Sequence, residues 1–337
     1  MLSLKYKKYN YEFKYPFETS KGIKTHQPTL IIALGINRLL GMGEATEISY
    51  HPETIDGMVE LLERNRMVIE RYTLIDNERY WHFLHHLVPD QHFLISALDI
   101  AGWDLMGKIR RMPVYKLLGL EWSNHVPKTD YTIGISDLDT IAQKIKEHPF
   151  ANFKVKVGNI NDVAHIEKIR SLTDANIRID ANEAWDLNTA KEILRAIKPF
   201  NIELIEQPLS KDASEDNLAL KEIIDIPIIA DEACQGMKDF EKIAPYFDGI
   251  NVKLSKHGGI TPSFQLIKAA KQANKKIMLG CMSEGNIGCG ALSHLLPMAD
   301  YADIDGPLIL NDTFAKAVTY DNDTIVMPHR EGIGIYS

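Results

Sequence analysis

The sequence is poor in cysteine and has no long hydrophobic run. Its 337 residues include three cysteines that form no CxxC pair, and this odd number argues against a disulfide framework. The longest purely apolar runs, such as Leu30–Leu34, are far too short to span a bilayer, and the opening segment MLSLKYKKYNYEFKY lacks the apolar stretch of a secretory signal. We therefore expect a cytoplasmic protein.

Positive charge is also scarce. The formal net charge is −8, and no block of Lys and Arg occurs along the chain. Binding to nucleic acid or to an anionic membrane surface draws on a basic stripe, so neither is an expected partner. The remaining composition, 45% hydrophobic and 25% charged, is that of an ordinary globular protein. Such a length predicts about two domains, or one large barrel with an appendage.

The first third of the chain predicts an α+β unit. The pattern from Leu2 to Glu47 is extended, with a strand expected over Leu30–Ile36. From Pro52 to Leu118 apolar residues recur at helical spacing, most clearly over Ser96–Met106. Runs of strands followed by runs of helices are typical of an α+β domain.

From about Lys128 a different rhythm begins. Short β-rich runs alternate with amphipathic windows, and the runs start roughly 22 to 27 residues apart, which is the length of one strand, one helix and two loops. Eight such units predict a (β/α)₈ barrel. A doubly wound open sheet is the rival, but no GxGxxG motif opens a helix here. The eight runs are Tyr131–Ile135, Phe153–Val157, Ile177–Asp180, Ile202–Glu206, Ile228–Asp231, Ile250–Lys253, Ile277–Gly280 and Tyr301–Asp303.

Ionisable residues gather at the ends of these runs, where the active sites of barrels lie. Asp180, Glu206 and Asp231 end consecutive runs at matching depth. Three clustered carboxylates repel one another unless a cation lies between them, and an all-oxygen ligand set suits Mg²⁺ or Mn²⁺. The alternative for each carboxylate alone is a salt bridge with a neighbouring lysine. For the three together we favour a metal site.

Lysines flank these carboxylates on two sides. Lys154 and Lys156 are two residues apart, so both side chains point to one face of a strand, and Lys253 comes from the strand after Asp231. Two bases on opposite sides of one carbon can carry out a two-base proton exchange. A lysine acts as a base only when its pKa is lowered, and both Lys154 and a divalent cation would lower it. Lys253 is preferred to Lys256 because it ends the apolar run INVK.

Taken together, these motifs resemble the enolase superfamily, in its muconate-lactonizing-enzyme subgroup, and most closely the dipeptide epimerases. The resemblance covers nearly the whole chain and includes SALDIAGWDLMGK in the first third. It implies a modified TIM (β/α)₈-type barrel at 121–314, an N-terminal α+β capping domain at 1–120, and a C-terminal segment at 315–337 that returns to the cap. The barrel motifs are Lys154-Val-Lys156, Asp180-Ala-Asn182, Glu206-Gln207-Pro208, Asp231-Glu232, and Lys253 followed by Lys256-His257-Gly258-Gly259.

The resemblance also implies a chemistry. Family members remove the proton α to a carboxylate and stabilise the resulting enediolate with Mg²⁺, for which Mn²⁺ can substitute. Lys156 would face the proton of the (R)-epimer and Lys253 that of the (S)-epimer. The remaining roles follow by analogy: Asp180, Glu206 and Asp231 as metal ligands, Lys154 and Thr132 as substrate contacts, and Asn182 and Glu232 as residues that orient their neighbours.

Asp303 and Asp305 indicate which member of the subgroup the chain resembles. Both point to one face at the rim and suit a substrate ammonium group, which dipeptide epimerases hold with an Asp-x-Asp pair. The alternatives are an N-succinylamino acid racemase or an o-succinylbenzoate synthase, whose substrates lack that ammonium, and a catalytically inactive barrel. Since members of the family often assemble, a homo-oligomer is a further expectation.

The side chain at the reacting carbon should meet the segment from Thr19 to His26. Members that act on Ala-Glu tend to have an Arg there, whereas this segment offers Lys21, Lys24 and His26. A flexible lysine reads a carboxylate less selectively than an arginine. We therefore expect small or apolar dipeptides such as Ala-Ala to be favoured, with either Lys21 or Lys24 able to pair with the glutamate of Ala-Glu.

Overall fold

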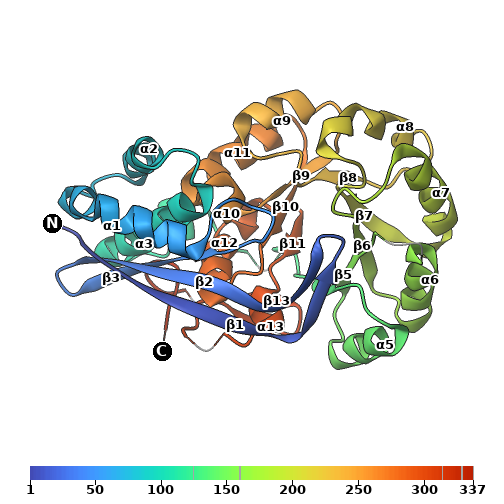
Figure 1. The fold of residues 1–337 in the computed structure, drawn as a ribbon, viewed down its shortest axis with the longest axis horizontal. Helices are drawn as coiled ribbons and strands as arrows, with labels where there is room; N and C mark the ends of the chain where they lie inside the picture. The colour runs from blue at the N-terminus through green and yellow to red at the C-terminus, as the bar shows by residue number, and fades with distance from the viewer. Residues whose placement is uncertain (124, 159–160, 313, 328, 337) are drawn as a thin grey trace.

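An antiparallel sheet with helices packs beside a parallel barrel in this computed structural model (Figure 1), which describes residues 1–123, 125–158, 161–312, 314–327 and 329–336. The N-terminal sheet has the order β1-β2-β3. Long β1 alternates exposed and less exposed residues, as a strand with one solvated face does. The strands of this sheet are β1 (Ser3–Thr19), β2 (Gly22–Ile36) and β3 (Leu39–Thr46). The helices that follow the sheet are α1 (Ile55–Arg71), α2 (Asn77–Leu87), α3 (His92–Arg110) and α4 (Val114–Leu117).

Two of these helices begin at side-chain caps. Thr54 accepts a hydrogen bond from the Gly57 amide, and Asp76 accepts one from the Arg79 amide, which satisfies donors that a helix leaves free at its start. Most residues of α3 are buried, as its apolar composition on all sides requires. The helix predicted over Ser96–Met106 is the centre of α3.

The barrel sheet contains eight parallel strands in the order β11-β10-β9-β8-β7-β6-β5-β4. A parallel bridge between Thr129 and Ala302 connects its two edges. The predicted barrel class is therefore confirmed, and the open-sheet alternative is wrong. The strands are β4 (Tyr131–Ile133), β5 (Asn152–Lys156), β6 (Asn176–Asp180), β7 (Ile202–Glu206), β8 (Ile228–Ala230), β9 (Gly249–Val252), β10 (Lys276–Gly280) and β11 (Tyr301–Asp303).

Helices cover the outer face of these strands (Figure 1) and bury the main hydrophobic core against them. No helix in the described part of the chain is both long and apolar enough to cross a membrane. The helices are α5 (Leu138–Glu147), α6 (Asp162–Leu172), α7 (Leu187–Ile197), α8 (Asn217–Lys221), α9 (Met237–Ile243), α10 (Leu254–His257), α11 (Ile260–Gln272), α12 (Asn286–Ser293) and α13 (Gly306–Ile309), with 3₁₀ turns at Lys198–Phe200, Lys211–Asp216 and Leu296–Met298 and a final hairpin of β12 (Thr319–Asp321) and β13 (Thr324–Val326).

Buried carboxylates of α3 connect the N-terminal helices to the rest of the chain. Asp99 accepts hydrogen bonds from the amide and the hydroxyl of Thr261 at the start of α11, at 3.0 and 2.7 Å. Asp104 accepts from the amides of Met42 and Ile333, at 2.8 and 2.9 Å. Because an ionised carboxylate makes strong hydrogen bonds when it is buried, these contacts fix α3 against both the barrel and the C-terminal segment.

Candidate active site

A cavity lies at the carboxyl ends of the barrel strands, and the tip of the β1–β2 hairpin forms part of its wall. The structure places eight of the residues that the sequence nominated in the lining of this cavity. The three predicted metal ligands, Asp180, Glu206 and Asp231, are buried and are not part of the lining. Glu232 is not part of the lining either. The nominated lining residues are Lys24, Thr132, Lys154, Lys156, Asn182, Lys253, Asp303 and Asp305. Cys281 and Met282, which follow β10, also line the cavity.

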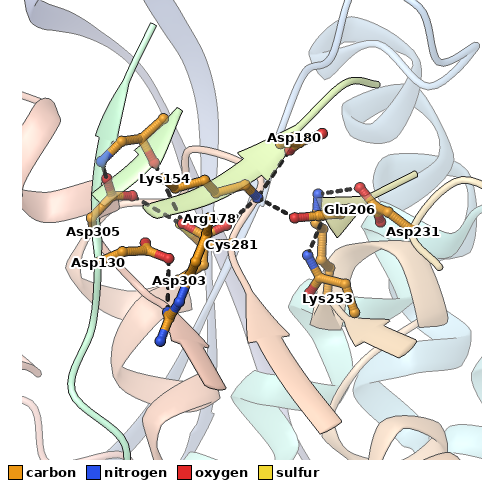
Figure 2. A network of polar contacts seen from close by, with 12 residues as sticks. Asp130, Lys154, Arg178, Asp180, Glu206, Asp231, Lys253, Cys281, Asp303 and Asp305 are labelled. Atoms are coloured by element: carbon orange, nitrogen blue, oxygen red, sulfur yellow. Dashed lines mark hydrogen bonds and ion pairs between the residues drawn. The ribbon is translucent and has the colours of Figure 1, made fainter. Parts of the chain in front are cut away.

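Lys154 and Lys156 extend from the same face of β5. The Nζ atom of Lys154 lies 3.0 Å from Asp180, 2.7 Å from Glu206 and 2.7 Å from Asp303. Lys156 Nζ lies 2.5 Å from Asp180 and 3.3 Å from Asn182. Lys154 therefore joins the acidic residues on β6, β7 and β11, as Figure 2 shows.

Lys253 follows β9 and enters the cavity from another part of the rim. Its Nζ lies 2.7 Å from Asp231 Oδ2 and 3.9 Å from the sulfur of Met282. Lys256, in α10, instead binds Asp231 Oδ1 at 2.7 Å and the carbonyl oxygens of Asp231 and Asn251. Lys253 thus lines the cavity, while Lys256 fixes Asp231 from below.

The carboxylates change the pKa of these lysines in the direction opposite to that expected of a base. Burial lowers the pKa of Lys253, but Asp231 and Glu206 outweigh burial and raise it well above its ordinary value. Asp180 and Asp303 do the same to Lys154. Lys154 lowers the pKa of Lys253, as expected, but the anionic carboxylates outweigh this effect; the lowering by a divalent cation stays a prediction.

Asp180, Glu206 and Asp231 stand at the ends of neighbouring strands β6, β7 and β8 and are almost fully buried. Burial raises the pKa of a carboxyl group, yet Lys154 and Lys156 hold the pKa of Asp180 below its ordinary value. Glu206 Oε2 receives no hydrogen bond from the described residues, although Lys154 Nζ lies 2.7 Å away. This buried all-oxygen donor set fits a Mg²⁺ ion.

The predicted ligands are less closely spaced than another acidic group. Among the described residues, the carboxylates whose oxygens all lie within 4.8 Å of one another are those of Asp130, Asp303 and Asp305. Lys253 and Lys256 each bind one oxygen of Asp231. The three predicted ligands thus lie at the ends of neighbouring strands, and lysine amines occupy both oxygens of Asp231.

Asp303 and Asp305 face the cavity together with Thr132. The Thr132 amide donates to Asp305 Oδ2 at 2.7 Å, and its hydroxyl lies 3.5 Å from Asp303 Oδ1. Burial and the nearby charge of Asp303 raise the pKa of Asp305 to about 7. A cation bound between the two carboxylates would favour the ionised form of Asp305.

The segment Thr19–His26 is the tip of the β1–β2 hairpin, where Thr19 pairs with Gly22. Lys21 Nζ lies 3.2 Å from Glu183. Lys24 has no ion pair among the described residues, and burial, followed by the charges of Lys156 and Lys253, lowers its pKa to about 8. Lys24 is thus a partly desolvated cation at the cavity that lacks an acidic partner.

Asn182 and Glu232 form a short polar chain beside Lys156. Asn182 accepts from Lys156 through Oδ1 and donates to Glu232 Oε1 at 3.2 Å. Burial, with the charges of Asp231 and Asp180, raises the pKa of Glu232 to about 7. This geometry orients the amide of Asn182 so that its oxygen faces the lysine.

Sequence reasoning missed a buried pair beneath Asp303. Arg178 Nη1 donates to Asp130 Oδ2 at 2.9 Å. Arg178 lies two residues before Asp180 on β6, so both point into the barrel, and a buried arginine needs an acidic partner. That spacing was the available signal, although the sequence alone does not identify Asp130 as the partner.

Comparison with known proteins gives matches over almost the whole chain. Residues 2–119 match the mandelate racemase/muconate lactonizing enzyme N-terminal domain, and residues 137–336 match the family described as enolase C-terminal domain-like. An L-Ala-D/L-amino acid epimerase of Maribacter sp. is 38% identical and covers 99% of both chains.

Solved structures agree with these matches. A dipeptide epimerase of Cytophaga hutchinsonii, in complex with Mg and D-Ala-L-Val, has a TM-score of 0.93 and 28% identity over 100% of this chain and 96% of its own. A dipeptide epimerase of Enterococcus faecalis, in complex with Mg and L-Leu-L-Tyr, has a TM-score of 0.93 and 27% identity over 99% of both chains.

Proposed function

Because the chain belongs to the mandelate racemase/muconate lactonizing enzyme family of the enolase superfamily, we propose that it is a Mg²⁺-dependent dipeptide epimerase. It is an isomerase that inverts the α-carbon of the C-terminal residue of a dipeptide. The observation that carries this proposal is the cavity itself, which two lysine amines line together with the paired carboxylates of Asp303 and Asp305. Relatives named as epimerases of this kind align with the chain over nearly their full length, and this similarity supports the proposal.

The reaction requires one proton to leave the α-carbon and another to arrive on the opposite side. Lys156, as a neutral amine, takes the proton of the (R)-epimer, and the ammonium of Lys253 returns one to the other face of the planar enediolate. The reverse direction exchanges the two roles. Asn182, held by Glu232, keeps the amine of Lys156 directed into the cavity.

Asp180, Glu206 and Asp231 are the residues that would hold the metal. When bound there, Mg²⁺ would neutralise the carboxylates that raise the pKa of Lys253 and would supply positive charge beside the substrate carboxylate. Lys154 adds a fixed positive charge at the same place, since it is buried and remains protonated. The substrate carboxylate is thereby oriented before its α-proton is removed.

Proton exchange tests the proposed function directly. The protein is incubated with Mg²⁺ in D₂O and a panel of dipeptides, and mass spectrometry follows the C-terminal residue. We expect one deuteron at its α-carbon, together with the appearance of the other epimer. If no dipeptide in the panel exchanges, while N-succinylamino acids do, the alternative activity replaces this one.

Replacing Asp303 with Asn should lower kcat/KM for dipeptides by on the order of 10²-fold, because a buried charge partner of the ammonium is lost. Asp305→Asn should act in the same direction without disturbing the Lys154–Asp303 pair. Steady-state kinetics with Ala-Ala measures both. The matched control is Asp300→Asn, at the start of β11 and beside partly exposed Lys276, and it should have little effect. Equal losses in all three variants would contradict the role in ammonium binding.

The side chain at the reacting carbon is proposed to lie near Lys24, with small and apolar residues favoured. Lys24→Met should lower kcat/KM for Ala-Glu roughly tenfold and leave Ala-Ala within about threefold, because only the glutamyl carboxylate pairs with the lysine. Lys21→Met at the same tip is the control, since Lys21 already pairs with Glu183. A wild-type enzyme that strongly prefers Ala-Glu would overturn the expected preference for Ala-Ala.

Three broader features are part of the same proposal. We assign residues 1–120 to a cap, 121–314 to the barrel and 315–337 to a segment returning to the cap, with residues 124, 159, 160, 313, 328 and 337 outside the described structure. The hydrogen bonds that connect Gly332 to Met112 and Val114 support this return. The free cysteines agree with a cytoplasmic location, and a homo-oligomer is the proposed assembly.

A further inference from the structure

Asp130 is a fully buried acid to which the proposed reaction assigns no task. It directly precedes β4 and lies beneath the cavity, outside its lining. Figure 2 draws it beside Arg178 and Asp303. Arg178 Nη1 donates to Asp130 Oδ2 at 2.9 Å, and the same arginine also binds Glu203 at 2.5 Å and the Ala302 carbonyl at 2.7 Å. Among the described residues, Arg178 is the only cation that contacts Asp130, and it also binds Glu203.

The other oxygen of Asp130 has no donor. Oδ1 is buried and receives no hydrogen bond from the described residues. One oxygen each of Asp130, Asp303 and Asp305 lies within 4.8 Å of the other two. Buried carboxylates this close repel one another, and a proton on one of them, shared in a hydrogen bond with its neighbour, removes the repulsion.

The surrounding charges decide which residue carries that proton. Lys154 on β5 lies 2.7 Å from Asp303 and stabilises its ionised form. Asp130 meets the negative charges of Asp303 and Asp305 in addition to the positive charges of Arg178 and Lys154. Burial and Asp303 raise the pKa of Asp130 well above its ordinary value. Because Lys154 contacts Asp303 directly, while Asp130 shares Arg178 with Glu203, these charges favour the proton on Asp130 and the anionic form of Asp303.

We propose that Asp130 is a positioning residue for the ammonium group of the substrate: its protonated carboxyl donates to Asp303 through Oδ1 and accepts from Arg178 through Oδ2. This inference rests on the proposed function, because it takes Asp303 as an ammonium-binding residue. The hydrogen bond fixes the orientation of Asp303 from below, while Lys154 fixes it from the side. The neutral carboxyl does so without adding a third negative charge to the cluster.

Two substitutions separate this role from its alternatives. Asp130→Asn keeps a donor for Asp303 and an acceptor for Arg178, so KM for Ala-Ala should stay within about threefold of wild type. Asp130→Leu removes both and should raise KM about 10- to 100-fold with kcat little changed, since it removes a buried hydrogen bond to a charged group. An N-acetylated dipeptide, which lacks the ammonium, should inhibit all three proteins equally. Thermal melting verifies folding.

The opposite results are equally informative. An ionised Asp130, acting as a third ammonium or metal ligand, predicts that Asp130→Asn damages binding as much as Asp130→Leu, and this result would overturn the proposal. An unchanged KM in folded Asp130→Leu would also overturn it. A loss confined to kcat would place Asp130 in proton transfer rather than in positioning and would contradict the proposal as well.

An infrared measurement tests the proton without any substrate. The other buried acids are present in both proteins, so their bands cancel in the wild-type minus Asp130→Asn difference spectrum. At neutral pH this spectrum should show the carbonyl stretching band of a protonated carboxylic acid. Absence of the band refutes the protonated state. Should the enzyme epimerise no dipeptide, the proposed function fails while this measurement still reports on Asp130.

Discussion

Replacing either Lys156 or Lys253 with alanine should lower the rate of epimerisation by about 10²- to 10⁴-fold, the usual contribution of a positioned general acid or base. Each direction of the reaction needs one lysine to remove the proton and the other to return it, so neither can substitute for the other. The amines line one cavity from β5 and from the end of β9. Chiral chromatography of the reaction mixture measures the rate at which one epimer is converted into the other.

The two variants should also differ in which epimer exchanges with solvent. In D₂O, Lys156→Ala should still exchange the α-proton of the (S)-epimer through Lys253, and Lys253→Ala that of the (R)-epimer through Lys156. Lys276→Ala is the matched control, because Lys276 begins β10 at the opposite end of a barrel strand and is half exposed. Full inversion by either active-site variant would refute the two-base mechanism.

Removal of divalent cations with EDTA should reduce epimerisation to background, and added Mg²⁺ should restore it. Mg²⁺ should also raise the melting temperature, since a ligand at about 100 times its Kd adds roughly 2.7 kcal/mol of stability. Glu206→Gln should greatly weaken this thermal shift, because it removes the charge of one of the three buried carboxylates proposed to hold the ion.

A second acidic cluster makes the choice of control important. The carboxylates of Asp130, Asp303 and Asp305 are close enough together to resemble a metal site. Asp305→Asn should preserve the Mg²⁺-dependent shift in melting temperature if the ion binds Asp180, Glu206 and Asp231. If this variant loses the shift and Glu206→Gln retains it, the metal assignment is wrong.

The barrel strands were predictable because each is a short β-rich run, and five of the eight predicted runs end at a charged residue. The runs Ile202–Glu206 and Tyr301–Asp303 coincide with β7 and β11, and the other six predicted runs differ from the observed strands by one or two residues at an end. The N-terminal sheet was harder to predict. One strand was expected within Leu30–Ile36, but β1 is long and polar on its solvated side, so hydrophobic runs do not mark it.

The sequence predicts the site residues that lie at strand ends, because strand spacing fixes the face to which each side chain points. It does not predict contacts between residues on distant strands of the barrel. The side chains of Lys154 and Lys156 share a face of β5, as their spacing requires. The ion pair of Asp130 with Arg178 joins residues 48 positions apart, which no local pattern identifies. The direction in which the pKa of Lys253 moves likewise depends on distances to Asp231 and Glu206.

The anchoring of α3 limits how a substrate can reach the reaction centre. Swinging the N-terminal helices away as a lid would break the contacts of Asp99 with Thr261 and of Asp104 with Ile333. The hairpin tip contacts the barrel through the Lys21–Glu183 ion pair and through the hydrogen bond from the Ile135 amide to the Glu18 carbonyl oxygen. We therefore expect a dipeptide to enter beside this tip rather than between the N-terminal helices and the barrel.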